Sequence, residues 1–371
     1  MNVVHVGKYY HPYQRGIETY LRLLCERLNR EVNLDVLVAH DHWRTVHETV
    51  NGVRVTRLGR VAEICATSFC LGLAPALRRL RPDIVHVHLP NPWAEASYFL
   101  AGCPGRLVVS FHSDIIRQRW LLKLHAPLHR RFLARASRII VATPEHIRHS
   151  PFLARLPRER CTVVHYGIET ERFALDAAMR TRVNALQAAI GAPRVLFVGR
   201  LVYYKGLDVL LRAAVDVPAQ IMIVGAGPLE QRLRTLAAEL GIGARVHLLG
   251  EVDAATLVAA YHACDVFCLP STARSEAFGI VQLEAFAAGK PVVSTQLPSG
   301  VPYVNQHGRT GLVVPPGDAQ ELARALNTLL KDEALRATLG AQARERVEQE
   351  FNADRMAAET LRVYNEVLTT G

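Results

Sequence analysis

Hydrophobic residues along this chain of 371 residues form short continuous runs that alternate with longer stretches of helical spacing. Short runs bounded by turn residues predict buried strands. In the first half these are Val3–Val6, Leu34–Ala39, Val53–Leu58, Ile84–His88, Leu107–Phe111, Arg138–Ala142 and Cys161–His165. In the second half they are Val195–Val198, Gln220–Val224, Val246–Leu249, Val266–Leu269, Pro291–Ser294 and Gly311–Val314. Helical patterns between them, such as Ile17–Leu28, Ala74–Leu80 and Trp93–Ala101, predict an α/β fold with parallel sheets covered on both faces.

The length suits two domains of roughly 170–190 residues each. The segment from Tyr166 to Ala192 contains no strand pattern and is the expected connection. We therefore predict two Rossmann-like units with a cleft between them, residues 1–170 and 171–352. A final helical pattern, Ala353 to Val367, lies beyond the last strand of the second unit.

Charge is unevenly distributed between the halves. Residues 1–182 hold 27 Lys and Arg against 15 Asp and Glu, a net charge of +12, whereas residues 183–371 have a net charge of −2. The segment Arg117 to Arg135 mixes cations with Trp120 and Phe132, which is typical of a helix on an anionic lipid surface and equally of a solvated helix face. No nucleic-acid-binding motif accompanies the charge, so nucleic acid is not an expected partner.

Cysteine usage and hydropathy predict a cytoplasmic protein. The seven cysteines form no Cys-x-x-Cys pair, as expected for free thiols in a reducing compartment. No secretory signal pattern starts the chain, and no run of 18 apolar residues could span a membrane. If the basic segment contacts lipid, the protein would be peripheral on the inner face of the cell membrane.

Two glutamates stand out in the second half. Glu276 follows the strand Val266–Leu269, in the loop where ligands of open α/β sheets bind, and is expected to contribute little to the core. Glu284 lies about one turn into the next helix. Between them lies Ala277-Phe278-Gly279-Ile280, a candidate donor-binding turn in which the amides of the last three residues are placed like those of a phosphate-binding helix start. A phosphate anchor flanked by two acceptor carboxylates fits a sugar nucleotide.

This segment resembles the Glu-x7-Glu motif of the retaining GT-B glycosyltransferases of family 4. The resemblance implies a GT-B fold whose C-terminal helix, residues 353–371, crosses back onto the N-terminal domain. That domain would bind the acceptor, and residues 171–352 would bind the nucleotide sugar. It also implies that Glu276 holds the hydroxyls of the donor sugar and that Glu284 holds the ribose.

Two cations follow the strand Val195–Val198, in Gly199-Arg200-Leu-Val-Tyr-Tyr-Lys205-Gly206. Fixed cations at a strand end can neutralise a departing diphosphate. The pattern is similar to the diphosphate-binding pair of the family, in which Arg and Lys replace a metal ion. No Asp-x-Asp motif is placed at a strand end, so we expect neither a metal nor another cofactor.

Glycine-rich turns supply further candidates for donor binding. Gly225-Ala-Gly227-Pro228 follows a strand but fails as a dinucleotide fingerprint, because the third glycine position is Glu230. In the resembled family this turn lines the nucleotide pocket, and Leu249-Gly250 borders the base. Near the N-terminus, Gly16 would allow close approach to a phosphate. The family usually has Gly-Gly there, so Arg15 is a departure that could itself reach the phosphate.

Histidines mark the first half. His112 ends the strand Leu107–Phe111, and its position matches a family histidine that contacts the donor sugar. His86 and His88 share a strand face as metal ligands can, but no third ligand is evident, so we prefer a structural role. His88, Tyr10 and His11 are assigned to the acceptor side.

The resemblance therefore implies a retaining, metal-independent hexosyltransferase of polysaccharide biosynthesis, acting on a glycan or lipid-linked acceptor. His112, Glu276, Arg200 and Lys205 are the predicted catalytic residues. The segment Val304-Asn-Gln-His-Gly-Arg-Thr-Gly311 resembles bacterial surface-polysaccharide enzymes, many of which transfer mannose. This resemblance implies GDP-mannose as the first expected donor, ahead of a UDP-hexose. The alternatives are a nucleotide-sugar epimerase, a phosphorylase-type enzyme of the same fold, or a non-catalytic nucleotide-sugar-binding protein.

Overall fold

The structure, a computed structural model, describes residues 1–13, 16–65, 67–114 and 119–369, with side chains in the last range from residue 124 onward. The chain divides into two compact units. Unit 1 is Met1–Gly167 with Ala353–Gly371, and unit 2 is Ile168–Asn352. Arg15 and Arg117, both singled out in the sequence, lie outside the described residues, as do the side chains of Arg119 and Lys123.

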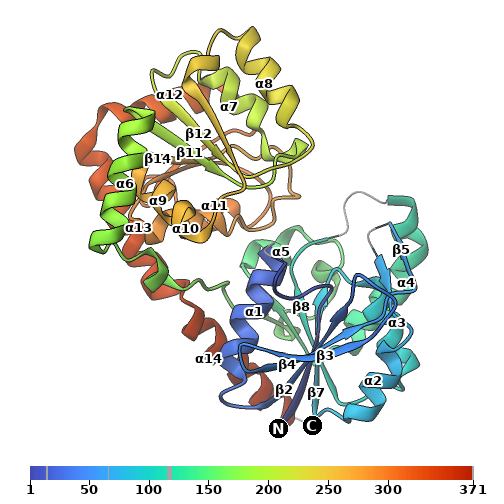
Figure 1. The fold of residues 1–371 in the computed structure, drawn as a ribbon. Coiled ribbons are helices and arrows are strands. Elements are labelled where there is room, and N and C mark those ends of the chain that lie inside the picture. Colours follow the sequence, from blue (N-terminus) through green and yellow to red (C-terminus); the bar gives the residue numbers. More distant parts are fainter. Residues whose placement is uncertain (14–15, 66, 115–118, 370–371) are drawn as a thin grey trace. The chain divides into compact units, whose positions relative to one another are not determined.

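Unit 1 is built from alternating strands and helices (Figure 1). Its elements are β1 (Asn2–Val6), α1 (Gly16–Leu28), β2 (Asn33–Ala39), β3 (Val46–Val50), β4 (Val53–Leu58), β5 (Ala62–Ile64), β6 (Thr67–Phe69), α2 (Leu73–Leu80), β7 (Ile84–Leu89), α3 (Pro92–Leu100), β8 (Arg106–Phe111), α4 (Arg119–Arg135), β9 (Arg138–Val141), α5 (Pro144–His149), β10 (Cys161–Val163) and α14 (Ala353–Thr369).

The main sheet of unit 1 has the order β10-β9-β8-β7-β1-β2-β4-β3. Neighbouring strands are parallel except for β3, which runs antiparallel to β4. The chain leaves β1 to one side for β2 and later returns to the other side for β7, so β1 and β7 flank the point where the strand order reverses. Ligands of doubly wound folds bind at the carboxyl ends of the strands at such a point.

Each face of this sheet has its own apolar core. One core contains residues of α1 and α14, including Tyr20, Leu24 and Tyr364. The other contains residues of α2, α3 and α4, including Leu77, Tyr98 and Phe132. The last helix of the chain thus completes the core of the unit that contains the first strand (Figure 1).

The sequence missed three strands of unit 1, namely β3 and the hairpin β5–β6. The strand β3 lies at the edge of the sheet and is mostly exposed. The hairpin strands contain three residues each and pair only with one another. None of them forms the buried apolar run on which the prediction depended, because an edge strand needs no hydrophobic face on either side.

Unit 2 repeats the architecture, and its parallel strands have the same relative order as the parallel strands of unit 1. Its elements are α6 (Ala177–Ile190), β11 (Arg194–Val198), α7 (Leu207–Ala213), β12 (Gln220–Val224), α8 (Glu230–Glu239), β13 (Val246–Gly250), α9 (Ala254–Ala263), β14 (Val266–Leu269), α10 (Val281–Ala287), β15 (Val292–Thr295), α11 (Val301–Val304), β16 (Gly311–Val314), α12 (Ala319–Lys331) and α13 (Glu333–Glu350).

The six strands of unit 2 are all parallel, in the order β13-β12-β11-β14-β15-β16. Strands β11 and β14 are neighbours in the sheet, although two strands separate them along the chain. This is the strand order of a doubly wound dinucleotide-type sheet, whose switch point lies between β11 and β14. The prediction of two Rossmann-like sheets is confirmed.

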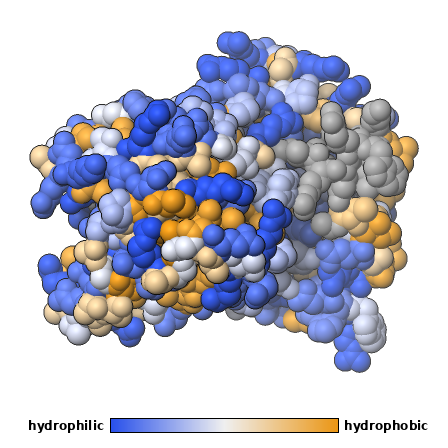
Figure 2. Space-filling model, turned by 90° about the horizontal axis from the view of Figure 1, so that it is seen from above, coloured by the Kyte–Doolittle hydropathy of each residue, from blue (hydrophilic) through white to orange (hydrophobic). Residues whose placement is uncertain are grey.

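Hydrophobic residues gather in patches among hydrophilic ones on the face shown in Figure 2. Among the described residues, no helix is both long enough and apolar enough to cross a bilayer.

Candidate active site

Two charged side chains meet where β11 and β14 end in unit 2. Lys205 Nζ lies 2.6 Å from Oε2 of Glu276, and both residues are only 8% exposed. The hydroxyl of Ser271 donates to the same carboxylate oxygen at 3.0 Å. Glu276 is therefore held in a buried ion pair, which corrects the expectation of a loop carboxylate with little part in the core. A short, poorly hydrated pair of this kind fixes the geometry of both side chains.

Close backbone packing places this ion pair. Lys205 ends a short 3₁₀ helix, Tyr203–Lys205, and Gly206 follows with φ +67°. A Cβ atom on Gly206 would lie 2.0 Å from the carbonyl oxygen of Pro270. Nearby, the amide of Thr272 donates to the carbonyl of Tyr204 at 2.8 Å. Only glycine at 206 lets the loops after β11 and β14 approach this closely, so the turn determines where Lys205 meets Glu276.

Arg200 lies at the same corner and is exposed. Burial raises the pKa of the Tyr204 phenol, and the negative charge of Glu276 raises it further. The positive charges of Lys205 and Arg200 act on the same phenol in the opposite direction. Both predicted cations therefore lie near Tyr204, at the switch point of the sheet. A diphosphate bound there could be neutralised by them.

The glycine-rich turn after β12 packs against the loop that carries Arg200. A Cβ atom on Gly225 would lie 2.2 Å from the carbonyl oxygen of Gly199. The amide of Gly225 donates to the carbonyl of Gly250 at 2.7 Å, and Leu201 donates to Ala226 at 3.0 Å. The sequence-predicted residues of this group, namely Gly199, Gly225, Gly227, Pro228, Leu249 and Gly250, thus lie in adjoining loops and the end of β13.

The turn that enters α10 is anchored on both sides. Ala277 accepts a bond at 2.7 Å from the amide of Gly300, and Phe278 is 3% exposed with its ring beside Phe351. The carbonyl of Gly279 accepts from Gln282, which starts the helical pattern. Ile280 is the N-cap residue of α10.

Glu284 lies in the first turn of α10, and its Oε2 accepts from the phenol of Tyr261 at 2.5 Å. Burial raises the pKa of this carboxyl, whereas the bond from Tyr261 and the charge of Arg172 lower it. Glu276 and Glu284 thus have different surroundings: a cation holds the first, and a neutral phenol holds the second.

In unit 1 the predicted residues are divided between surface and core. Gly16 is exposed at the start of α1, and the carbonyl of His11 accepts from the guanidinium of Arg57. Tyr10 is completely buried and His88 is 2% exposed, so neither presents a surface to an acceptor in this structure. Both side chains are buried because Tyr10, after β1, and His88, on β7, lie on the face of the sheet that α1 and α14 cover.

His112 lies directly after β8 and is 3% exposed. Its Nδ1 contacts the phenol of Tyr166 at 2.5 Å, and its Nε2 contacts Nδ1 of His88 at 3.2 Å. Burial lowers the pKa of His112 to about 3, so the imidazole is neutral at physiological pH. With both nitrogens engaged, the side chain can contact a sugar only if one of these partners is exchanged.

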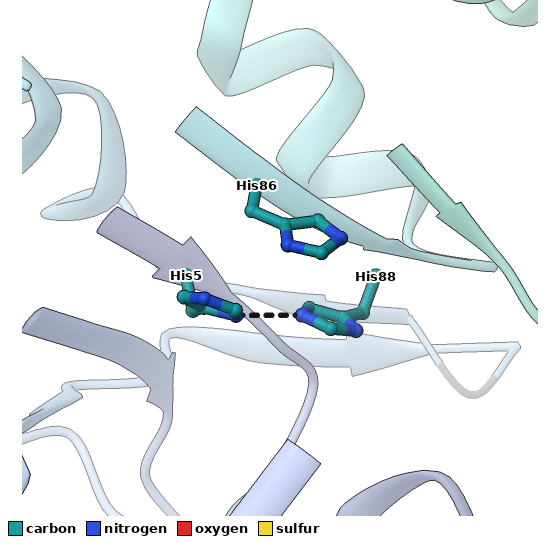
Figure 3. A group of neighbouring side chains, drawn as sticks. All are labelled: His5, His86 and His88. Carbon is teal, nitrogen blue, oxygen red and sulfur yellow. Dashed lines mark hydrogen bonds between the residues drawn. The ribbon is translucent and has the colours of Figure 1, made fainter. Parts of the chain in front are cut away.

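Two groups of described residues have the composition of a metal site. The first, shown in Figure 3, is His5 on β1 with His86 and His88 on β7. His5 is the third member that the sequence did not reveal, because register pairs it with His86 across two strands far apart in the chain. Each ring nitrogen of the three already has a hydrogen-bond partner, so a cation would have to displace one of them.

The second group is Glu95 on α3 with His125 and His129 on α4. His129 Nδ1 lies 3.0 Å from Oε1 of Glu95, and His125 Nε2 lies 3.2 Å from Oε2. The two histidines hold the pKa of this buried carboxyl below its usual value, against the effect of burial. The nitrogens facing Glu95 already contact it, so a cation at this position would have to displace these contacts.

Sequence reasoning missed the partners that hold the predicted side chains. Ser271, Tyr261, His5, Tyr166 and Tyr364 carry no motif that marks them. Their roles depend on which strands and helices become neighbours. Ser271 alone could have been found from the sequence, because it lies between the end of β14 and Glu276.

The chain is similar to known glycosyltransferases over most of its length. Residues 14–172 match the family model "Glycosyltransferase Family 4", and residues 183–346 match "Glycosyl transferases group 1". The D-rhamnosyltransferase WbpZ of Pseudomonas aeruginosa is 36% identical over 95% of this chain and 93% of its own length. The O-antigen chain mannosyltransferase C of Escherichia coli is 32% identical over 99% of both chains.

Solved structures share the fold. Sucrose-phosphate synthase of Thermosynechococcus elongatus has a TM-score of 0.82 at 23% identity and full coverage of both chains. HepE of Anabaena in complex with UDP also has a TM-score of 0.82, at 21% identity, over 99% of this chain and all of that one. The likeness at these identities concerns the GT-B fold alone.

Proposed function

The chain belongs to glycosyltransferase family 4, and on that premise we propose that it is a retaining, metal-independent hexosyltransferase of polysaccharide biosynthesis. The donor would be a nucleotide-diphosphate sugar, and the acceptor a glycan or a lipid-linked glycan. The observation that carries the proposal is the corner formed by Arg200, Lys205 and Glu276 at the carboxyl ends of β11 and β14. It lies at the topological switch point of unit 2, where doubly wound sheets bind ligands.

We assign the roles by the charges present. Arg200 and Lys205 neutralise the departing diphosphate, which is the part of the reaction where negative charge develops. The ion pair with Glu276 holds Lys205 in place before the donor arrives. Glu276 then accepts hydrogen bonds from sugar hydroxyls, and Glu284, held by Tyr261, accepts them from the ribose. The Ala277–Ile280 turn and the Gly225–Pro228 turn line the same donor site.

The proposed chemical step is attack from the face of the leaving group. The acceptor oxygen bonds to the anomeric carbon while the bond from that carbon to the phosphate oxygen breaks. The proton of the acceptor hydroxyl passes to the departing phosphate oxygen, so no protein nucleophile and no external base is needed. This route keeps the anomeric configuration of the donor.

We propose a mannose-type donor, with GDP-mannose first. The relatives named above transfer mannose or D-rhamnose, which is 6-deoxymannose. More distant relatives are named GDP-mannose-dependent mannosyltransferases, and a solved neighbour was crystallised with UDP-glucose. The axial 2-hydroxyl shared by mannose and D-rhamnose is the feature we expect the site to select.

The test is transfer from GDP-mannose, GDP-D-rhamnose and UDP-glucose to the glycan acceptor, with NMR of the product linkage, in buffer with EDTA. Transfer that survives EDTA and keeps the donor configuration supports the proposal. An inverted linkage, or activity that EDTA abolishes and a divalent ion restores, contradicts it. Binding without transfer would favour a non-catalytic nucleotide-sugar-binding protein. Epimerised donor would favour a nucleotide-sugar epimerase, and transfer from a sugar phosphate would favour a phosphorylase-type enzyme.

We further propose that unit 1 contacts an anionic membrane surface through α4, where a lipid-linked acceptor would be met. Leu124 is 78% exposed, and Arg130, Arg131 and Arg135 on the same helix are exposed. An exposed apolar residue among arginines suits a lipid interface, where each cation near an anionic leaflet contributes about 1 kcal/mol. The enzyme would then work at the inner face of the cell membrane.

A further inference from the structure

Four buried side chains and the partly buried Tyr166 form one continuous hydrogen-bonded chain through unit 1. It starts at Tyr364 on α14, whose phenol lies 3.0 Å from Nε2 of His5 on β1. His5 Nδ1 lies 3.0 Å from Nε2 of His88 on β7. His88 then contacts His112, which in turn contacts Tyr166. The chain joins the last helix of the protein to the predicted sugar-contacting histidine.

A side branch leaves from Tyr364. Its phenol also lies 2.5 Å from Nδ1 of His86, whose Nε2 lies 2.8 Å from the hydroxyl of Ser110. All four histidines are at most 3% exposed. Figure 3 shows His5 and His88 facing one another across β1 and β7, with His86 beside them. In such surroundings an unpaired polar atom is unfavourable, so complete pairing is a strong constraint.

Proton counting leaves this network only two arrangements. A neutral imidazole has one donor and one acceptor nitrogen. If Tyr166 donates to Nδ1 of His112, then His112, His88 and His5 must each carry the proton on Nε2, and His5 donates to Tyr364. If His112 donates to Tyr166, then every ring carries the proton on Nδ1, and Tyr364 donates to His5. A mixed arrangement would place two protons, or none, between one pair of nitrogens.

We propose that His5, His88 and Tyr364 are positioning residues that set the tautomer of His112. Through Tyr364, this tautomer depends on how α14 packs against the sheet. This inference rests on the proposed role of His112 at the donor sugar. A sugar hydroxyl that takes the place of Tyr166 would meet an acceptor in the first arrangement and a donor in the second. The bond that His88 keeps with Nε2 determines which of the two His112 presents.

Tyr364→Phe is the sharpest test, because it removes one oxygen and keeps the ring that packs between α14 and the sheet. We expect kcat to fall about 5- to 10-fold, with the KM for the donor within 2-fold of wild type. In the free protein, ¹⁵N NMR of the imidazoles should change from one tautomer of His112 to a mixture. Tyr98→Phe is the matched control, a buried tyrosine in the other core of the unit, bonded to the carbonyl of Gly105, and should leave both readouts unchanged.

Wild-type kcat and an unchanged tautomer in Tyr364→Phe would overturn the inference. If that variant does not fold, His88→Asn serves instead, since it keeps a polar group toward His112 but cannot reach His5, and the same two results are expected. His112→Ala separates the two proposals. Full transfer by His112→Ala would remove the role of His112 at the sugar, whereas the NMR result in the free protein still reports whether the network sets its tautomer.

Discussion

The donor corner of unit 2 lies in the loops after β11 and β14, whereas the histidine network of unit 1 lies on β1, on β7 and directly after β8. The two sheets are similar, but the two regions differ in their electrostatics. Arg200, Lys205 and Glu276 carry formal charge, and a close backbone approach at Gly206 holds them in place. The four histidines of the network are neutral, because burial lowers the pKa of His5 and His112 to about 3 and that of His86 and His88 well below the usual value.

The difference follows from what each region would have to bind. A diphosphate brings negative charge that only cations can offset, so unit 2 keeps positive charge at its switch point. A sugar hydroxyl is neutral and directional, so a neutral imidazole of fixed tautomer suits it without the cost of a buried charge. The same sheet geometry therefore supports charge neutralisation in one unit and hydrogen-bond direction in the other.

Removing a cation should give the largest effect. Lys205→Ala deletes a charge contact to the leaving diphosphate, so kcat for transfer should fall by roughly 10² or more. Steady-state kinetics with GDP-mannose would measure it. Lys331→Ala, an exposed lysine at the end of α12, is the control and should behave as wild type. A loss below 10-fold would mean that Lys205 does not act on the leaving group.

Neutralising Glu276 should affect both activity and stability. Glu276→Gln keeps the shape of the side chain but removes the charge that pairs with Lys205. We expect kcat to fall about 10²-fold and the free energy of unfolding to fall by about 1–3 kcal/mol, since Lys205 is left buried without its counterion. Kinetics and denaturant unfolding would measure the two. Unchanged stability would show that the pair is hydrated and replaceable.

Acid should destabilise unit 1 through the four buried histidines of the network. Their pKa values are lowered in the folded state, so the unfolded chain binds more protons as the pH falls below about 6.5. The contribution of these histidines to the free energy of unfolding is fully present above that pH. It is lost as the pH falls toward 3, at up to about 1.4 kcal/mol per pH unit for each histidine. Hydrogen exchange of β1 and β7 amides from pH 7.5 to 5 would measure it.

A variant can show whether the histidines of the network cause this pH dependence of stability. His5→Gln should make the slope shallower, because one titrating ring is removed. His42→Gln, at an exposed histidine, should leave the slope unchanged. Equal slopes in all three proteins would show that the network does not titrate as a buried neutral group.

Glu284→Ala should mainly weaken nucleotide binding, by about 10-fold for loss of a charged hydrogen-bond acceptor. Because burial raises the pKa of Glu284, wild-type affinity should decline on acidification earlier than for an ordinary carboxyl, and the variant should lack this decline. Calorimetry with GDP across pH would measure both, with Glu239→Ala, an exposed glutamate of α8, as control. A loss of kcat with unchanged affinity would assign Glu284 to the sugar instead.

The smallest effect concerns the membrane. Replacing Arg130, Arg131 and Arg135 by Ser should weaken co-sedimentation with anionic vesicles about 10-fold at low salt, and high salt should weaken the wild type in the same way. Neutral vesicles, and a variant with Ser at Arg232, Arg234 and Arg324 of unit 2, are the controls. Binding that is absent at low salt, or insensitive to the change in α4, would show that this helix face is only solvated.

Buried strands and motif residues were readable from the sequence because their signals are local. An apolar run between turn residues predicts a central strand wherever it folds, and all thirteen predicted strands are present. Gly206 and Lys205 could be assigned to one turn because they are adjacent. The exposed strand β3 and the hairpin β5–β6 could not be predicted, since neither buries an apolar run.

The sequence by itself determined the two parallel sheets and the residue types at their strand ends, because strand burial and turn chemistry depend on a few consecutive residues. Only the tertiary structure decided that Lys205 meets Glu276, that Tyr261 holds Glu284, and that His5 and Tyr364 join the histidines of β7. These contacts link residues up to 359 positions apart, and they depend on strand order and helix packing. Hydrogen bonding at such range is fixed by which elements become neighbours, a property of the whole fold that no local pattern carries.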